Sequence, residues 1–278
     1  MKRIILLLMS FVVAISASAS QRDTLRVLAI GNSFSEDAVE DHLYSLAAAE
    51  GVTLIIGNMY IGGCSLERHV DNMKGNKPAY LYKKVSADGK LTATPEFTLS
   101  NALSDEEWDY VTLQQVSHFS GQSETYFPYL QELVNYVFSE CPEAEIMFHM
   151  TWAYDPDTGH HGFANYDRDQ LKMYNAILDA VEYAVDKVGI ERVIPSGTAI
   201  QNARTTVLED KVNRPDGFHL SLPHGRYVAG CVWCEFLLGK NVTGNAYVAE
   251  GMTPEECRLA QKAAHAAVRR PGKIKRIR

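Results

Sequence analysis

Short, almost uninterrupted apolar runs alternate with amphipathic stretches along most of the chain. A strand that is apolar on both faces must be covered on both faces, which is typical of parallel sheets. Parallel neighbours need a crossover connection, which is right-handed and usually contains a helix. The alternation therefore predicts a doubly wound α/β fold in which two layers of helices enclose a five-stranded parallel sheet. The expected strands are residues 25–30, 52–56, 110–113, 146–150 and 192–194, and the expected helices are residues 38–50, 66–73, 129–138, 169–188, 198–207, 225–238 and 254–268.

The segment of residues 79–100 does not follow this alternation. Ser86-Ala87-Asp88-Gly89 is a turn sequence, and the stretches on both sides of it are rich in residues that favour strands. We therefore predict a β-hairpin inserted between the second and third strand–helix units. It is expected to be an excursion from the domain.

The first residues of the chain have the order of a secretory signal peptide. Lys2 and Arg3 precede an apolar run over residues 4–15, and Ala17-Ser18-Ala19 follows as a cleavage site. The run is too short to span a bilayer, and no other stretch is long and apolar enough. We expect residues 1–19 to be removed, with export to the periplasm or outside the cell. Residues 20–278 contain no repeat or linker and are expected to form one domain.

Charge narrows the range of partners. The chain has 27 basic and 34 acidic residues, a net charge of −7. This acidity argues against nucleic acid and against anionic membrane as partners, because both bind to basic faces. The basic residues concentrated in residues 269–278 are expected to form a solvated end. The oligomeric state stays open.

Polar segments, several of them containing glycine, follow the expected strands. Ligands of an open parallel sheet bind outside the carboxyl ends of its strands, so catalytic side chains are expected there. The segments are Gly31-Asn32-Ser33-Phe34-Ser35, Gly62-Gly63-Cys64-Ser65, Gln114-Gln115-Val116-Ser117-His118, Thr151-Trp152-Ala153-Tyr154 and Pro195-Ser196-Gly197, and Asp216-Gly217-Phe218-His219-Leu220-Ser221 precedes a helix near the end of the chain.

Ser33, His219 and Asp216 are a candidate catalytic triad. A hydroxyl nucleophile needs a base within hydrogen-bond reach, and the base needs an acceptor that orients it. Asp216 and His219 lie three residues apart across Gly217, so one tight turn can present both side chains on the same side. Asp216 would then accept from one imidazole nitrogen while the other nitrogen faces Ser33.

An oxyanion that develops on attack needs hydrogen-bond donors. The backbone N–H of Ser33, at a junction of strand and helix, is one candidate. Gly63 can bring a second N–H close because it has no Cβ, although a purely structural role for this glycine is an equal alternative. The side-chain amide of Gln115 is the third candidate, with Gln114 and Ser117 as alternatives.

These segments resemble the conserved blocks of the SGNH, or GDSL-like, hydrolases. Gly31-Asn32-Ser33-Phe34-Ser35 is similar to their first block and Asp216-Gly217-Phe218-His219 to their last, and the order along the chain is the same. With Leu113-Gln114-Gln115, they resemble the uncharacterised secreted branch DUF4886. The resemblance implies a flavodoxin-like α/β/α fold and hydrolysis of esters, often acetyl groups on carbohydrates. It implies Ser33 as nucleophile and donor, His219 as base, Asp216 as its orienting partner, and Gly63 as a donor. No cofactor is implied.

The sequence departs from the SGNH pattern at two places. Asn32 stands where many members have aspartate. The third block lacks the Gly-x-Asn-Asp sequence that contains the donor asparagine, so Gln115 is offered as a substitute.

Other residues of the strand-end segments are candidates for substrate binding. Trp152 is expected to pack or to offer a sugar-stacking surface, and His161 is expected to line the pocket from a loop. His160 and His161 are adjacent and lack the i, i+4 spacing of helical zinc sites, so no metal is expected. The alternatives are a glycan-binding protein that has lost turnover, and a metal-dependent hydrolase centred on His160, His161 and Asp155 or Asp157.

Overall fold

The computed structural model describes residues 24–278, and the expected signal peptide lies outside this range. One seven-stranded sheet has the order β4-β3-β2-β1-β5-β6-β7. The five strands from β2 to β7 in this order run parallel, which confirms the expected α/β fold. The strands are β1 (Thr24–Gly31), β2 (Thr53–Tyr60), β3 (Tyr80–Val85), β4 (Leu91–Phe97), β5 (Tyr110–Leu113), β6 (Glu145–His149) and β7 (Arg192–Ile194).

The expected number of five strands is wrong, because the hairpin extends the sheet instead of leaving it. β3 pairs antiparallel with β2, from Ile56 opposite Val85 to Tyr60 opposite Leu81, and β4 pairs antiparallel with β3. This pairing satisfies the backbone groups of β2 that would otherwise be open at an edge. β4 is the outer strand, is almost entirely exposed and contains Pro95, a residue tolerated only at edges.

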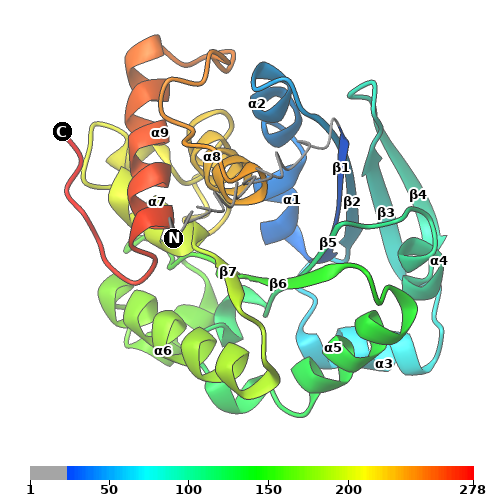
Figure 1. Cartoon of the computed structure of the whole chain (residues 1–278). Coiled ribbons are helices and arrows are strands. Elements are labelled where there is room, and N and C mark those ends of the chain that lie inside the picture. The colour runs from blue at the N-terminus through cyan, green and yellow to red at the C-terminus, as the bar shows by residue number, and fades with distance from the viewer. Residues whose placement is uncertain (1–23) are drawn as a thin grey trace, which may run out of the picture.

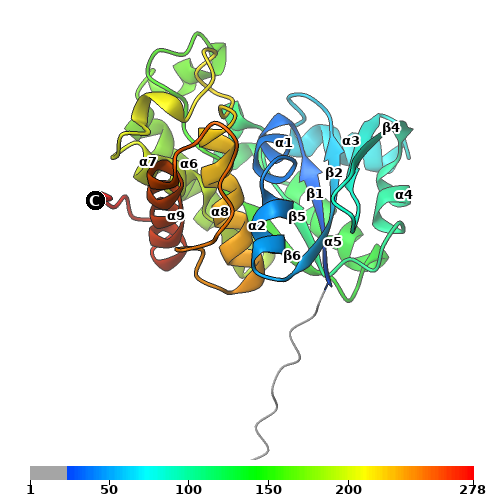
Figure 2. The same ribbon diagram turned by 90° about the horizontal axis from the view of Figure 1, so that it is seen from above.

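Helices cover both faces of the sheet (Figure 1). One layer contains α1, α2, α7, α8 and α9, with α8 in contact with the other four, and Figure 2 looks onto it. The opposite layer contains α3, α5 and α6. The helices are α1 (Ser33–Val39), α2 (Leu43–Ala49), α3 (Leu66–Lys74), α4 (Leu99–Leu103), α5 (Tyr129–Glu140), α6 (Gln170–Val188), α7 (Ser196–Ala203), α8 (His224–Leu238) and α9 (Pro254–Arg269), with short 3₁₀ helices η1 (Ser117–Phe119), η2 (Ser123–Thr125), η3 (His161–Tyr166) and η4 (Glu209–Lys211). Within residues 24–278, every helix falls short of the length and apolar character that a membrane crossing requires.

The first expected helix, residues 38–50, differs from the structure. Helical structure already begins at Ser33, and it is interrupted between α1 and α2. At this interruption Glu40 forms an ion pair with Lys83 of β3, and Asp41 forms one with Arg226 of α8. The chain therefore changes direction where its charged side chains are paired with neighbouring elements, and Ser33 becomes the first residue of a helix.

Residues 269–278 are more ordered than the expected solvated end. The backbone N–H of Lys275 donates to Asn202 Oδ1 at 2.6 Å, and that of Ile277 donates to Thr205 Oγ1 at 3.0 Å. Ile274 and Ile277 pack against the core. The segment is therefore fixed along α7, although its charged side chains are exposed.

Candidate active site

Ser33 lies where β1 passes into α1. Asn32 caps the helix by accepting the backbone N–H of Phe34 at 3.0 Å, so Ser33 is held at the first helical position. Its side chain is half-buried. Among residues 24–278, neither the hydroxyl nor the backbone N–H of Ser33 has a hydrogen-bond partner. Both groups are therefore free for a substrate.

Asp216 and His219 are held together by the turn that joins them. Asp216 Oδ2 lies 2.8 Å from His219 Nδ1, while Asp216 Oδ1 accepts the backbone N–H groups of Phe218 and His219, both at 3.0 Å. Gly217 has φ +75°, which explains a glycine at this position. Partial burial opposes ionisation, but these hydrogen bonds outweigh it and lower the pKa of Asp216. The ionised carboxylate keeps the proton on His219 Nδ1, which leaves Nε2 as the available base.

Three contacts bring the His219 loop against α1. The backbone N–H of Leu220 donates to Asp37 Oδ2 at 2.7 Å, and the rings of Phe34 and His219 lie 6.0 Å apart. Trp152 stacks on Phe34 at 4.2 Å, and its Nε1–H donates to the carbonyl of Phe218 at 2.8 Å. The structure therefore places the catalytic candidate His219 beside the residue that follows Ser33.

Asp37 holds this junction from the α1 side. Burial raises its pKa to about 6, against the opposing effect of Arg226, with which Asp37 forms a buried ion pair. Arg226 in turn pairs with Asp41 at 2.6 Å. Because Asp37 accepts from Leu220, these ion pairs connect the position of His219 to both α1 and α8.

Trp152 has a structural role, and the expectation that it offers a sugar-stacking surface is wrong. Its side chain is 0% exposed. One face is covered by Phe34, and its only polar group is bonded to Phe218. The ring therefore supports the Ser33 and His219 loops from beneath and has no face left for a ligand.

Gly63 lies in the turn between β2 and α3. It is exposed and has φ +61°. The backbone N–H of Gly63 has no acceptor within residues 24–278, as for Ser33. Asn32 connects the two loops, since its Nδ2 donates to the carbonyl of Cys64 at 3.0 Å. Two unpaired backbone donors are thus carried by loops that one buried asparagine joins.

Gln115 is not available as the third donor, which corrects that expectation. Its Nε2 donates both hydrogens to Thr125, to the carbonyl at 3.0 Å and to Oγ1 at 3.1 Å. Its Oε1 accepts the backbone N–H groups of Leu66 and Val116. The buried amide is fully used in holding loops together.

Gln114, one of the two alternatives, lies beneath the site and is bonded to two buried side chains. Its Nε2 donates to Asn32 Oδ1 at 2.9 Å, so its Oε1 must be the acceptor for His149 Nδ1, also at 2.9 Å. His149 Nε2 then accepts from Ser196 Oγ at 2.9 Å. Burial lowers the pKa of His149 to about 3, which keeps the imidazole neutral. The sequence alone does not indicate this connection between His149 and Asn32, because the residues that form it lie on different strand ends.

Ser117, the other alternative, shares a hydrogen bond of 2.7 Å with the hydroxyl of Tyr154. Either hydroxyl can be the donor, so the pair retains a hydrogen for another acceptor. Ser117 is nevertheless buried. The backbone N–H groups of Ser33 and Gly63 therefore remain the candidate donors for an oxyanion.

This network explains why Asn32 stands where many SGNH hydrolases have aspartate. We expect Asn32→Asp to lower the free energy of unfolding by about 2–3 kcal/mol, because the donor to the Cys64 carbonyl is lost and a buried carboxylate oxygen faces that carbonyl. Urea unfolding measures the change. Asn135→Asp, on the exposed face of α5, is the matched control and should change stability by less than about 0.5 kcal/mol. Equal stability of both variants would contradict the role given to Asn32.

Histidines from two loops form a wall beside the candidate triad. The ring of His118 lies 5.8 Å from that of His160 and 5.7 Å from that of His161, and His160 and His161 stack at 4.7 Å. His160 also contacts Phe218, which neighbours His219, at 4.8 Å. Burial and the neighbouring imidazoles lower the pKa of His118, and they lower that of His160 to about 4. His161 is exposed, and its expected role in lining the pocket stays a prediction. No group of three or more His, Cys, Asp or Glu residues suited to holding a metal occurs within residues 24–278.

The chain is similar to one protein family and to several solved structures. The model of the family described as "Domain of unknown function (DUF4886)" matches residues 26–267. A DUF4886 family protein from Bacteroides uniformis ATCC 8492 is 54% identical, with 91% of this chain and 98% of that chain covered and a TM-score of 0.89. No curated protein matches.

More distant structures share the fold. "A putative SGNH hydrolase" from Slackia heliotrinireducens is 21% identical, covers 77% of this chain and 99% of its own, and has a TM-score of 0.52. "A putative GDSL-like lipase" from Parabacteroides merdae ATCC 43184 is 13% identical, covers 76% of this chain and 94% of its own, and has a TM-score of 0.50. These similarities show that the fold is that of SGNH hydrolases, as the sequence blocks imply.

Proposed function

This chain belongs to the DUF4886 family and has the fold of SGNH hydrolases, and from that premise we propose that it is an exported serine esterase that removes a small acyl group, such as acetyl, from a carbohydrate. The observation that carries the proposal is the pairing of His219 Nδ1 with Asp216 Oδ2 at 2.8 Å, on a loop held against the helix that Ser33 begins. Export rests on the sequence of residues 1–19 alone.

The proposed reaction begins with proton transfer from Ser33 Oγ to His219 Nε2. The oxygen attacks the ester carbonyl, and the carbonyl oxygen becomes an oxyanion. The imidazolium, stabilised by Asp216, then gives its proton to the departing sugar hydroxyl, and the acyl group stays on Ser33. A water molecule loses a proton to His219 and attacks the acyl-enzyme, which releases the carboxylic acid and restores Ser33.

The oxyanion would be held by the backbone N–H groups of Ser33 and Gly63, both unpaired among the described residues. Backbone donors cost no reorganisation at the moment of reaction because the loops that carry them are already fixed through Asn32. Each such donor is worth roughly 3 kcal/mol of barrier.

A carbohydrate as the alcohol part is supported by the histidine wall. His118 and His160 are held neutral, so the wall has polar groups and ring faces without a fixed charge at neutral pH. Such a surface suits a neutral sugar, whose hydroxyls bind imidazole nitrogens and whose apolar face packs on rings. An aliphatic chain would leave these polar atoms unpaired.

The exposed ring of His161 gives the test of this substrate class. We expect His161→Ala to raise KM for an acetylated xylo-oligosaccharide about fivefold, because one ring contact is worth about 1 kcal/mol, and to change kcat by less than twofold. Release of acetate measures both constants. An aryl acetate, which has no sugar to contact the wall, is the internal control and should keep its kcat/KM. Equal losses on both esters, or no loss on either, would contradict the assignment of the wall to the sugar.

A further inference from the structure

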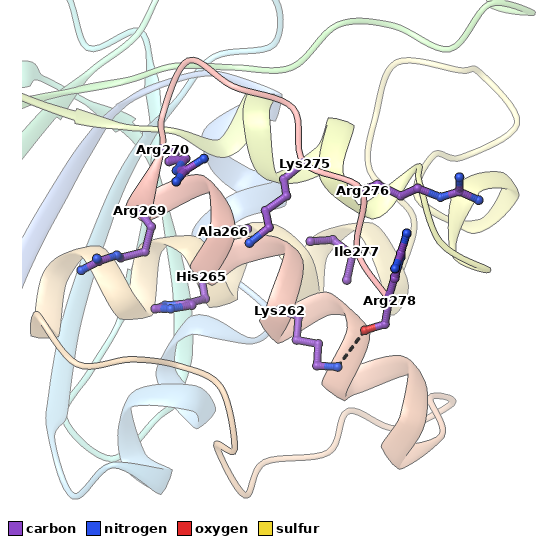
Figure 3. A pocket seen from close by; sticks show the side chains of 9 residues that line it. All are labelled: Lys262, His265, Ala266, Arg269, Arg270, Lys275, Arg276, Ile277 and Arg278. Carbon is purple, nitrogen blue, oxygen red and sulfur yellow. Dashed lines mark hydrogen bonds between the residues drawn. The ribbon is translucent and has the colours of Figure 1, made fainter.

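This acidic protein has a cluster of basic residues on α9 and on the segment that follows it. Residues 269–278 contain six basic residues and no acidic one. They fold back along α9 and surround a hollow of about 630 Å³ (Figure 3). The cations that line it are Lys262, Arg269, Arg270, Lys275, Arg276 and Arg278.

The segment is fixed in place by its backbone. Besides the bonds from Lys275 to Asn202 and from Ile277 to Thr205, the carbonyl of Pro271 accepts from Thr198, and the carbonyl of Arg278 accepts from Lys262 at 2.8 Å. Ordering a chain segment costs roughly 1–2 kcal/mol of entropy per residue, so a merely solvated end would not be held in this way. These backbone hydrogen bonds therefore hold the basic residues of the segment around the hollow.

Among the Asp and Glu side chains that the structure describes, none forms an ion pair with these cations. The ion pairs of α9 include those of Arg258 with Glu255 and of Lys211 with Glu256, which involve none of these cations. Carboxylates are also absent from the lining of the hollow. A recess lined by charges of one sign concentrates the field and attracts ions of the opposite sign.

The shape of the site indicates an extended ligand. A second hollow of about 510 Å³ adjoins the first, and the two share Arg276, Ile277 and Arg278. Thr205 and Thr206 also line the second hollow, but their hydroxyls are already bonded to backbone groups. Cations that line a groove of two adjoining hollows fit a ligand chain that carries oxyanions at more than one position.

We propose that this groove binds an acidic polysaccharide through carboxylate or sulfate groups on its sugar rings. Guanidinium groups bind such planar or tetrahedral oxyanions with two hydrogen bonds each. Single-stranded nucleic acid is less suited, because it needs aromatic stacking platforms and no Phe, Tyr or Trp lines either hollow.

The site is separate from the candidate triad. Its lining residues come from α9, from the segment that follows α7 and from the segment that follows α9, and none comes from the loops that carry Ser33, Gly63 or His219. The proposal therefore does not depend on the proposed esterase activity.

Binding of the full chain to two fluorescent oligosaccharides, a sulfated heparin octasaccharide and an octagalacturonate, tests the proposal. We expect at least one of them to bind, and the triple variant Arg269→Gln, Lys275→Gln, Arg276→Gln to raise that Kd at least tenfold. The control triple Lys77→Gln, Lys187→Gln, Lys273→Gln removes the same charge from exposed positions outside the groove and should change Kd less than twofold. The Kd values of the single variants Lys273→Gln and Lys275→Gln give the same comparison within residues 269–278, and Lys275→Gln should have the higher Kd. The melting temperature of each variant and its turnover of an aryl acetate should match those of the wild type.

Several outcomes would overturn the proposal. Equal losses of affinity in the two triple variants would show attraction by net charge alone. Tighter binding of an anionic vesicle (30% phosphatidylglycerol) or of a single-stranded octanucleotide, lost in the groove triple, would assign the groove to another class of partner. If neither oligosaccharide binds the protein at low salt, the proposed binding site is contradicted. A wild-type protein that binds the polysaccharide but hydrolyses no ester would instead contradict only the proposed function.

Discussion

Replacement of Ser33 by alanine is expected to lower kcat for an aryl acetate by at least about 10³-fold, since triad residues act as a unit and the loss of the nucleophile removes the acyl-enzyme route. The hydroxyl of Ser33 makes no hydrogen bond within residues 24–278, so the melting temperature should not change. Initial rates and a thermal unfolding curve, measured on the same preparation, separate loss of chemistry from loss of fold.

Ser35 is the matched control, two residues further along the same helix. Its buried hydroxyl lies 2.8 Å from both the carbonyl oxygen of Asn32 and Asn58 Oδ1, and these two acceptors share its one hydrogen. Ser35→Ala should therefore lose stability, by about 1–2 kcal/mol, and keep most of its activity. An active Ser33→Ala enzyme would contradict the assignment of the nucleophile.

Asp216→Asn is expected to lower kcat about 10³- to 10⁴-fold with the fold retained. The asparagine Oδ1 can still accept from Phe218 and His219, as Asp216 does. Its amide, however, donates to His219 Nδ1, which forces the proton onto Nε2 and removes the base that Ser33 needs. Steady-state kinetics at several pH values measure the loss.

Asp155→Asn is the control for this second prediction. Asp155 lies in the loop after β6, where its carboxylate accepts the backbone N–H of Asp157 at 3.0 Å, and it belongs to the metal-dependent alternative. The triad account expects Asp155→Asn to stay within about twofold of the wild type. A large loss in Asp155→Asn together with a small loss in Asp216→Asn would contradict it and favour the alternative.

The parallel part of the fold could be predicted because each of its strands is a continuous apolar run with a local signal. The pairing of the hairpin could not, since Ser86-Ala87-Asp88-Gly89 specifies a turn but not the edge that β3 joins. The same difference separates residues 269–278, whose charge is visible in the sequence, from the bonds to α7 that fix their position.

In the candidate site, too, contacts between residues close in sequence could be predicted, and contacts between distant residues could not. Asp216 and His219 are three residues apart, so their pairing follows from one turn. The roles of Gln114 and Gln115 could not be separated, because alternation of side chains ends where β5 ends and each amide finds partners distant in sequence. Trp152 follows a strand like the catalytic candidates, and only its packing on Phe34, distant in sequence, shows that it is covered.

Labelling with a fluorophosphonate, followed by peptide mapping, tests the central claim most directly. An activated serine displaces fluoride from the reagent and becomes phosphonylated on Oγ, whereas unactivated serines react slowly. We expect one adduct, on Ser33, which is lost in His219→Ala. An adduct on another residue, or an unlabelled protein that still binds acetylated glycan, would contradict the claim that Ser33, His219 and Asp216 act as a catalytic unit.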